Sequence, residues 1–352
     1  MSRRVLVAAL FFSAVAAVLP RPAAAIPVFA GRYGLTCQAC HTVVPHLTAF
    51  GEQFLANGYR VPGLKPKSAF PVALRVETAY SSASGGDAAP LPKTIVDEVE
   101  MLTGGALGKR GSYWAEVYAV DGGFPGRARD VWAAWRATPD GTATPVTLRA
   151  GRFTLPLPLD PETFRETTDH YAIWDQTAGD NPFSFFDPKL GGQIVAGDPA
   201  RGIAGSLSLL QGHDTASGLP AHGVDTMLAL QRQLGAFVVS AYRYDGSRGD
   251  RFWRDGYGIG WETGSTRVDA VYQNGNDAGS GAFLQLRQAF GDRAFGIARW
   301  DATAGPRFAR SVILGGGVRF SRNTRLTVFE TAARDAAGRF GYTTTSSFLF
   351  AL

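Results

Sequence analysis

The sequence is poor in charge and in cysteine, and it contains a single long apolar run. Charged residues make up 18% of the chain and hydrophobic residues 45%. This balance excludes an intrinsically disordered chain, because disorder needs low hydrophobicity and high net charge. The formal net charge of +5 includes Arg3, Arg4 and Arg21 of the first 25 residues. Nucleic-acid binding needs a clustered basic face, so we expect no nucleic acid among the partners.

The apolar run lies at the N-terminus. It extends from Val5 to Val18 after two arginines, and Ala23-Ala24-Ala25 supplies the small residues of a cleavage site. This pattern predicts a secretory signal peptide over residues 1–25 and a mature chain that begins at Ile26. A membrane anchor is the alternative, but the run is shorter than the roughly 20 residues of a spanning helix. No later segment has 18 consecutive apolar residues, so a mature protein in a membrane would have to be a β-barrel.

The two cysteines of the chain stand together in the sequence Cys37-Gln38-Ala39-Cys40-His41. The pattern C-x-x-C-H is the attachment motif of a c-type haem. Two thiols on one helical turn reach the two vinyl groups of the porphyrin, and the adjacent imidazole reaches the iron from the same face. We therefore predict one covalent haem c, bound through Cys37 and Cys40, with His41 as the proximal iron ligand.

Three other uses of such a cysteine pair are less consistent with the surrounding sequence. A thioredoxin-like redox pair needs alternating strands and helices, whereas the chain after the motif is rich in strands. A tetrahedral zinc site needs a second pair of cysteine or histidine ligands, which is absent nearby. A disulfide across so short a loop would stabilise little, and it would leave His41 without a role.

The segment of residues 26–67 is predicted to be the haem-bearing part, with a helix after the motif. Leu47, Phe50 and Phe54 recur at helical spacing, and Gly58 stands where a helix would stop. A segment of about 40 residues is too small to bury its own core and a porphyrin. We therefore expect another part of the protein, or a partner, to cover the haem.

Residues 68–352 show a different pattern, in which apolar and polar residues alternate over short runs. Val268, Ala270 and Tyr272, for example, alternate with polar neighbours. A period of two predicts strands with one apolar and one polar face. About 16 strands are expected, at residues 70–82, 93–107, 110–121, 127–138, 144–153, 189–198, 201–211, 224–234, 235–245, 253–263, 265–275, 279–290, 292–302, 307–320, 322–334 and 339–352.

The connections between these strands alternate in length. Tight turns such as Lys109-Arg110-Gly111 follow the even-numbered strands, and longer connections follow the odd-numbered ones, namely 82–92, 154–188, 212–223 and 246–254. Residues 139–145 are an exception. Short turns on one rim and long loops on the other are typical of an outer-membrane β-barrel. A soluble β-sandwich is the alternative, but the even strand count and aromatic residues near strand ends favour an antiparallel transmembrane β-barrel, porin-like, in the bacterial outer membrane and in contact with its lipid.

Residues 29–59 resemble the haem segment of the fused monohaem cytochrome-porins of bacterial outer membranes. Members of this family include the outer-membrane iron-oxidising cytochromes. The matching positions are Phe29-Ala30-Gly31, Gly34, Cys37, Cys40-His41, Pro45, Leu47, Phe50-Gly51, Phe54 and Asn57-Gly58-Tyr59. In that family the haem segment precedes a porin of about this strand count, and we expect the segment of this chain to act as a plug of its barrel. The resemblance implies covalent haem on Cys37 and Cys40, proximal ligation by His41 and electron transfer across the outer membrane.

The second axial ligand of the haem is not identified by a motif. His46 lies about 500° around a helix from His41 and so points away from the proximal face. His170 lies in the longest connection, which would fold inward if it behaves as porin loops do. Met227 shares the parity of Asp225 and Gln231 and is expected to face the lumen, whereas Met101 is expected to face lipid. Each of the three candidates also has an ordinary packing or solvated role.

The function expected from these features is electron transfer through the haem across the outer membrane. The electrons would come from an extracellular donor such as Fe2+, which would make the protein an Fe(II) oxidase, and would pass to a periplasmic electron-carrier cytochrome. A passive diffusion porin with a haem-bearing plug is the alternative. A haem enzyme such as a peroxidase is a third, although the sequence shows no compact cluster of histidine and arginine. The sequence leaves open the donor, the direction of transfer and whether the haem segment lies in the lumen or at the periplasmic mouth.

Overall fold

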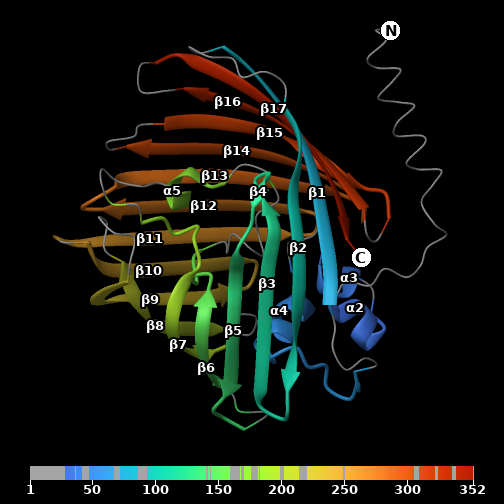
Figure 1. The fold of residues 1–352 in the computed structure, drawn as a ribbon, viewed down its shortest axis with the longest axis vertical. Coiled ribbons are helices and arrows are strands. Elements are labelled where there is room, and N and C mark those ends of the chain that lie inside the picture. Colours follow the sequence, from blue (N-terminus) through green and yellow to red (C-terminus); the bar gives the residue numbers. More distant parts are fainter. Residues whose placement is uncertain are drawn as a thin grey trace.

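In the computed structural model, the described part of the chain forms one large sheet and four short helices (Figure 1). The predicted signal peptide and His46 lie outside the described residues. The structure describes residues 28–35, 37–41, 47–66, 72–85, 93–139, 142, 144–158, 167, 170–175, 181, 183–198, 202–213, 220–248, 250–304, 309–321, 324–334 and 338–351.

The sheet has 17 strands, and without the two-residue β4 these are 16 long antiparallel strands, as predicted. Their bounds are β1 Val72–Gly85, β2 Lys93–Leu107, β3 Gly111–Asp121, β4 Phe124–Pro125, β5 Ala128–Arg136, β6 Val146–Phe153, β7 Lys189–Gly197, β8 Ile203–His213, β9 Pro220–Leu234, β10 Phe237–Arg248, β11 Asp250–Thr263, β12 Thr266–Gly275, β13 Gly279–Phe290, β14 Ala294–Ala304, β15 Ala309–Arg319, β16 Thr324–Arg334 and β17 Phe340–Ala351.

The sheet closes on itself. Val76 of β1 pairs with Phe350 of β17 on one side and with Val99 of β2 on the other, so the first strand joins the last. Each remaining long strand pairs with its neighbours in sequence. A single closed sheet is a barrel and excludes the two-sheet β-sandwich.

The side chains alternate between the two faces of the wall. In β12, Arg267, Asp269 and Gln273 face inward and are buried, whereas Tyr272 is 47% exposed on the outside. The predicted orientations of the two methionines are confirmed, because Met227 is fully buried and Met101 is 48% exposed. Leucine, isoleucine, valine and aromatic side chains dominate the outer face, and this is the surface that a transmembrane barrel presents to lipid.

The connections form two different rims. We call the rim with turns 108–110, 235–236, 264–265 and 291–293, where β7 also ends and β8 begins, the short-turn rim, and the opposite one the long-loop rim. In an outer-membrane barrel the short turns lie on the periplasmic side. The predicted long connection at residues 246–254 is wrong, because β10 and β11 stay paired up to Arg248 and Asp250. The polar residues of this stretch belong to strand ends that extend beyond the apolar band.

The described residues of the connection between β6 and β7 fold into the lumen, as expected for a porin loop. They include the helix α5 (Ala172–Asp175), and Tyr171, Ile173 and Trp174 are at most 1% exposed. These side chains belong to an apolar cluster with inward-facing residues of the wall, among them Met227 and Phe283. The described part of the lumen is therefore packed with apolar side chains along this side.

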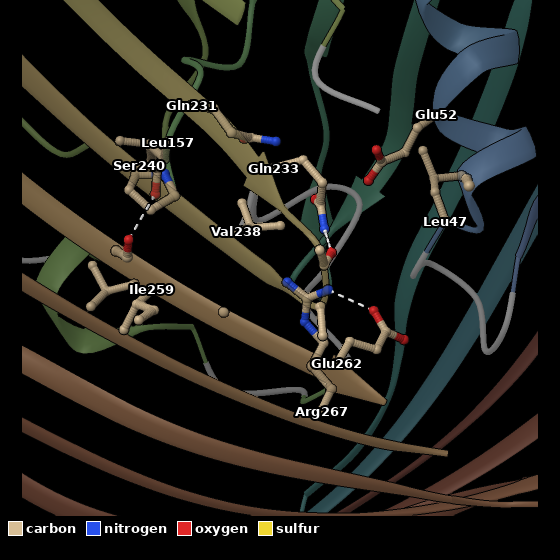
Figure 2. A pocket seen from close by; sticks show the side chains of 17 residues that line it. Leu47, Glu52, Leu157, Gln231, Gln233, Val238, Ser240, Ile259, Glu262 and Arg267 are labelled. Atoms are coloured by element: carbon tan, nitrogen blue, oxygen red, sulfur yellow. Dashed lines mark hydrogen bonds and ion pairs between the residues drawn. The ribbon is translucent and has the colours of Figure 1, made fainter. Parts of the chain in front are cut away.

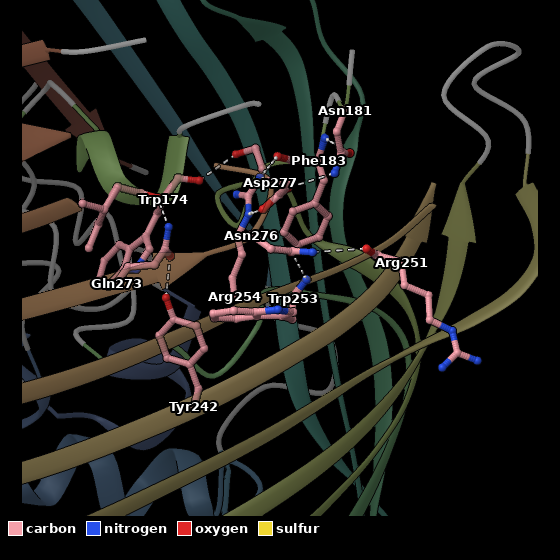
Figure 3. Close-up of polar contacts among 12 residues, drawn as sticks. Trp174, Asn181, Phe183, Tyr242, Arg251, Trp253, Arg254, Gln273, Asn276 and Asp277 are labelled. Carbon is pink, nitrogen blue, oxygen red and sulfur yellow. Dashed lines mark hydrogen bonds and ion pairs between the residues drawn. The ribbon is translucent and has the colours of Figure 1, made fainter. Parts of the chain in front are cut away.

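Arg254 of β11 fastens this loop to the barrel wall near the long-loop rim (Figure 3). Its Nε and Nη2 donate to the carboxylate of Asp277 at 3.1 and 2.9 Å, and its Nη2 also donates to the carbonyl oxygen of Phe183 at 3.3 Å. Asn181 of the loop donates to Asp277 at 3.0 Å. The loop is thus tied to two neighbouring parts of the wall through one fully buried guanidinium group.

The N-terminal segment contains the helices α2 (Val28–Tyr33), α3 (Cys37–Cys40) and α4 (Ala49–Ala56). In Figure 1 they lie together near the ends of β1 to β3 at the short-turn rim. The predicted helix after the motif is confirmed as α4, which begins after the N-cap Thr48 and ends at Ala56, before the C-cap Asn57. None of the helices among the described residues is long and apolar enough to cross a membrane.

Candidate functional site: the cysteine motif and the cavity beside it

The cysteine motif folds as a single helical turn that packs against the start of α4. The backbone N–H of Thr48 donates to the carbonyl oxygen of Cys40 at 2.9 Å, and its hydroxyl donates to that of Ala39 at 2.8 Å. An isolated antiparallel bridge joins His41 to Leu47. Thr48 therefore caps α4 and holds the motif at the same time, because its hydroxyl also accepts from the N–H of Gly51.

Gly51 allows this close contact between α3 and α4. A Cβ atom at this position would overlap the carbonyl oxygen of Cys40 and press on the side chain of Leu47. We expect Gly51→Ala to push α4 away from the motif and to destabilise the segment by about 2 kcal/mol, as overpacking does. Limited proteolysis of the folded barrel should then cleave the segment faster than in the wild type.

The control for this variant is Gly202→Ala, in a turn of the same rim, where an added Cβ meets no atom within 4 Å. If Gly51→Ala is cleaved no faster than Gly202→Ala, the contact between α3 and α4 is not what holds the motif.

An aromatic cluster fixes the segment to the inner wall. Tyr59 lies between Phe29, whose ring centroid is 4.5 Å away, and Trp132 of β5 at 6.1 Å. Phe29 also stacks on Trp114 of β3 at 6.0 Å. Tyr59 reaches this place because Gly58 and Tyr59 both adopt left-handed backbone conformations, with φ of 63° and 62°. A tyrosine in that conformation is strained, so the cluster must stabilise it.

Arginine side chains tie the segment to backbone groups of the barrel. Arg136 of β5 donates to the carbonyl oxygen of Ala56 at 2.9 Å and to the side chain of Asn57 at 3.0 Å. Arg60 donates to the carbonyl oxygens of Gly108 and Gly111 in the turn between β2 and β3. The segment is therefore held inside the short-turn mouth against β2, β3 and β5.

A cavity of about 480 Å³ separates α4 from the opposite wall (Figure 2). The segment contributes one side of it, the loop after β6 a second and the strands β9 to β12 a third. The lining residues are Leu47, Ala49, Glu52, Leu157, Pro158, Gln231, Gln233, Gly235, Ala236, Val238, Ser240, Gly258, Ile259, Gly260, Glu262, Arg267 and Val271.

The cavity wall carries a network of charges. Arg267 donates to Asp269 at 2.9 Å and to Glu262 at 2.9 Å, and Arg287 donates to Glu262 at 3.1 Å. On the opposite side, burial raises the pKa of the Glu52 carboxyl above its usual value, whereas the positive charge of Arg267 opposes this rise. Glu52 and Arg267 therefore face the same cavity from α4 and from β12.

Two candidates for the distal ligand, His170 and Met227, are not among the described residues that line this cavity. Met227 belongs to the apolar cluster under the inward loop. The ring of His170 stacks on Phe186 with the centroids 3.6 Å apart, and its Nδ1 lies 3.8 Å from a carboxylate oxygen of Asp175. His46 lies outside the described residues. The distal ligand stays a prediction, and the described residues contain no group of three histidine, cysteine or acidic side chains that could hold a metal ion.

Arg75, Arg149 and Arg287 form part of the charged lumen wall. Arg75 pairs with Glu98 and Glu100, and Arg287 pairs with Glu262. Arg149 lies over the ring of Trp132 at 4.5 Å. Glu52, Glu262 and Arg267 did not stand out in the sequence, because a carboxylate on a short helix and a charge pair on a strand are ordinary features without their neighbours.

Comparison with known proteins supports the barrel. No family model matches the chain, and no curated protein sequence is significantly similar to it. Several solved structures share its fold. The anion-selective porin of Comamonas acidovorans has a TM-score of 0.62 at 12% identity, and the match covers 81% of this chain and 99% of that one. OmpF of Salmonella typhi, in complex with daunomycin, has a TM-score of 0.57 at 11% identity, covering 80% and 97%.

A third structure, the trimer form of OmpT of Vibrio cholerae, has a TM-score of 0.55 at 9% identity, with 80% and 100% of the two chains covered. Identities this low show the fold alone. The chain is therefore a porin-like β-barrel of the outer-membrane type. The predicted fold class is confirmed, and the predicted location in the outer membrane agrees with this fold and with its apolar outer face.

Proposed function

We propose that the protein is an outer-membrane cytochrome-porin that transfers electrons through a covalent haem c held in the periplasmic mouth of the barrel. The observation that carries this proposal is the C-x-x-C-H turn, packed against α4, next to a cavity that α4 shares with the barrel wall. The electrons would come from an extracellular donor such as Fe2+ and would pass to a periplasmic electron-carrier cytochrome.

The residues around the cavity are compatible with a porphyrin. A volume of about 480 Å³ lies within the roughly 300 to 1,000 Å³ of small-molecule and cofactor pockets. Leu47, Leu157, Val238 and Val271 supply apolar surface, and Arg267 supplies charge. Cys37 and Cys40 would hold the porphyrin and His41 its iron, and the bound haem would supply a one-electron centre. The barrel wall provides the cover that a segment of this size cannot provide for itself.

The packing of the lumen supports electron transfer more than diffusion. The inward loop places fully buried side chains such as Ile173 and Phe185 where a diffusion pore would hold water, and the N-terminal segment occupies the mouth. A barrel filled in this way would limit the passage of ions and solutes, whereas electrons would still cross the membrane through the haem.

The second candidate is a passive diffusion porin whose haem-bearing segment is only a plug. The likeness of the barrel to diffusion porins favours it, in particular the likeness to the anion-selective porin of Comamonas acidovorans. This candidate predicts an ion-conducting pore and no electron transfer through the haem.

Reconstitution into liposomes separates the two candidates. The liposomes contain oxidised horse-heart cytochrome c, and ferrous citrate is added outside. We expect the haem-loaded protein to reduce the enclosed cytochrome faster than the same barrel made without c-type maturation, and we expect little conductance in a planar bilayer. Equal rates with and without haem, together with a large conductance, would contradict electron transfer and support the passive porin.

A further inference from the structure

Glu52 occupies a special position at the cavity. It is a partly buried residue of α4 directly after Gly51, which packs against Cys40 of the motif, and its carboxylate faces the cavity (Figure 2). Arg267 faces the same space from β12, on the opposite side. A cofactor attached to the neighbouring turn and seated in this cavity would lie in the electric field of both groups.

Arg267 already forms ion pairs with two carboxylates of the wall. Its guanidinium group donates to Asp269 and to Glu262, both at 2.9 Å. Arg287 donates to the other carboxylate oxygen of Glu262 at 3.1 Å. Asp198, at the short-turn rim, contributes a further negative charge near Glu52. Among these described groups, the four carboxylates of Glu52, Glu262, Asp269 and Asp198 outnumber the two arginines, so together they are negative when every carboxylate is ionised.

Among these carboxylates, Glu52 is the one that α4 places beside the motif. Asp269 and Glu262 lie on the barrel wall, and each accepts from an arginine. Burial raises the pKa of Glu52, Arg267 lowers it, and the charges of Glu262 and Asp198 raise it further. An additional negative charge in the cavity would raise it again, because charges interact strongly where water is excluded.

We propose that Glu52 is the proton-linked group of the haem site: its carboxylate binds one proton when one electron enters the haem and releases that proton when the electron leaves. The electron comes from the donor, the proton comes from water at the periplasmic mouth, and an O–H bond forms on Glu52. The total charge of the cavity then stays the same in both oxidation states. This inference rests on the proposed function, because it requires the haem to occupy the cavity.

Redox titration of the haem-loaded protein at several pH values tests the inference. We expect the midpoint potential of the wild type to fall with rising pH in a window above the usual pKa range of glutamate. In Glu52→Gln this window should be lost, and in Glu52→Asp, which retains a carboxylate, it should remain. Any pH dependence that the carboxylates of the haem itself contribute would persist in every variant.

Asp292→Asn, an exposed carboxylate at the same rim, is the matched control and should behave like the wild type. Visible spectra before each titration confirm that the variants carry the same haem coordination. If the protein carries haem and Glu52→Gln keeps the pH dependence of the wild type, the inference about Glu52 is overturned while the proposed function stands. If the wild type carries no haem, the proposed function itself fails.

Discussion

Replacing Cys37 and Cys40 together by serine is expected to remove all covalently bound haem from the protein. Serine keeps the size and the helical turn of the motif, but it cannot form a thioether bond to a porphyrin vinyl group. The chain has no other cysteine, so no second attachment site can compensate. A haem-peroxidase stain of a denaturing gel of the outer-membrane fraction should show a band for the wild type and none for the double variant.

Antibody detection of the same band shows that the barrel is still made and inserted, which is expected because the motif lies outside the sheet. Variants of the three distal candidates, His46→Ala, His170→Ala and Met227→Leu, are the controls and should keep the stain, because they do not carry the thioether bonds. The variant among them that removes the true distal ligand should change the spectrum from low-spin to high-spin. A wild-type band without stain, from cells that mature c-type cytochromes, would refute the covalent haem.

Arg254→Met is expected to release the inward loop from the wall. Methionine fills a similar apolar volume beside Phe183, but it leaves Asp277 without its guanidinium partner. Removing one partner of a buried ion pair costs about 3 kcal/mol, and here the loss falls on the contacts that tie the loop to β11. We therefore expect a lower midpoint of urea unfolding in lipid vesicles and a larger conductance in planar bilayers.

Arg251→Met provides the matched control, since Arg251 lies on the same strand but is exposed and points away from the network (Figure 3). It should change neither the unfolding midpoint nor the conductance. If Arg254→Met also leaves both unchanged, the loop is held by its apolar contacts alone, and the buried ion pair has no role in closing the lumen.

The barrel could be predicted from the sequence because its physical origin is local. Each strand must place apolar side chains toward lipid and polar ones toward the lumen, so residues such as those of β12 alternate one by one. Strand ends are less well defined. The hairpin between β10 and β11 continues to Arg248 and Asp250, because backbone pairing does not stop where the apolar band ends.

The C-x-x-C-H motif was equally visible, since two cysteines and a histidine on one turn lie within five consecutive residues. The residues that contact the motif could not be recognised in the sequence. Thr48 and Gly51 hold it through contacts with Cys40, and the opposite wall of the cavity comes from residues more than 150 positions later. Such pairs have no spacing rule, because strand register and barrel closure decide which side chains meet.

The sequence by itself determined that the chain is a strand-rich barrel with one C-x-x-C-H motif near its start, because both follow from short-range patterns. Only the tertiary structure decided where the motif lies, which charged groups face it and how far the lumen is filled. Closure of the barrel brings β12 opposite α4, so that Arg267 faces Glu52. The inward fold of the loop after β6 depends on buried contacts with many strands, above all those of Arg254, and no local pattern encodes these contacts.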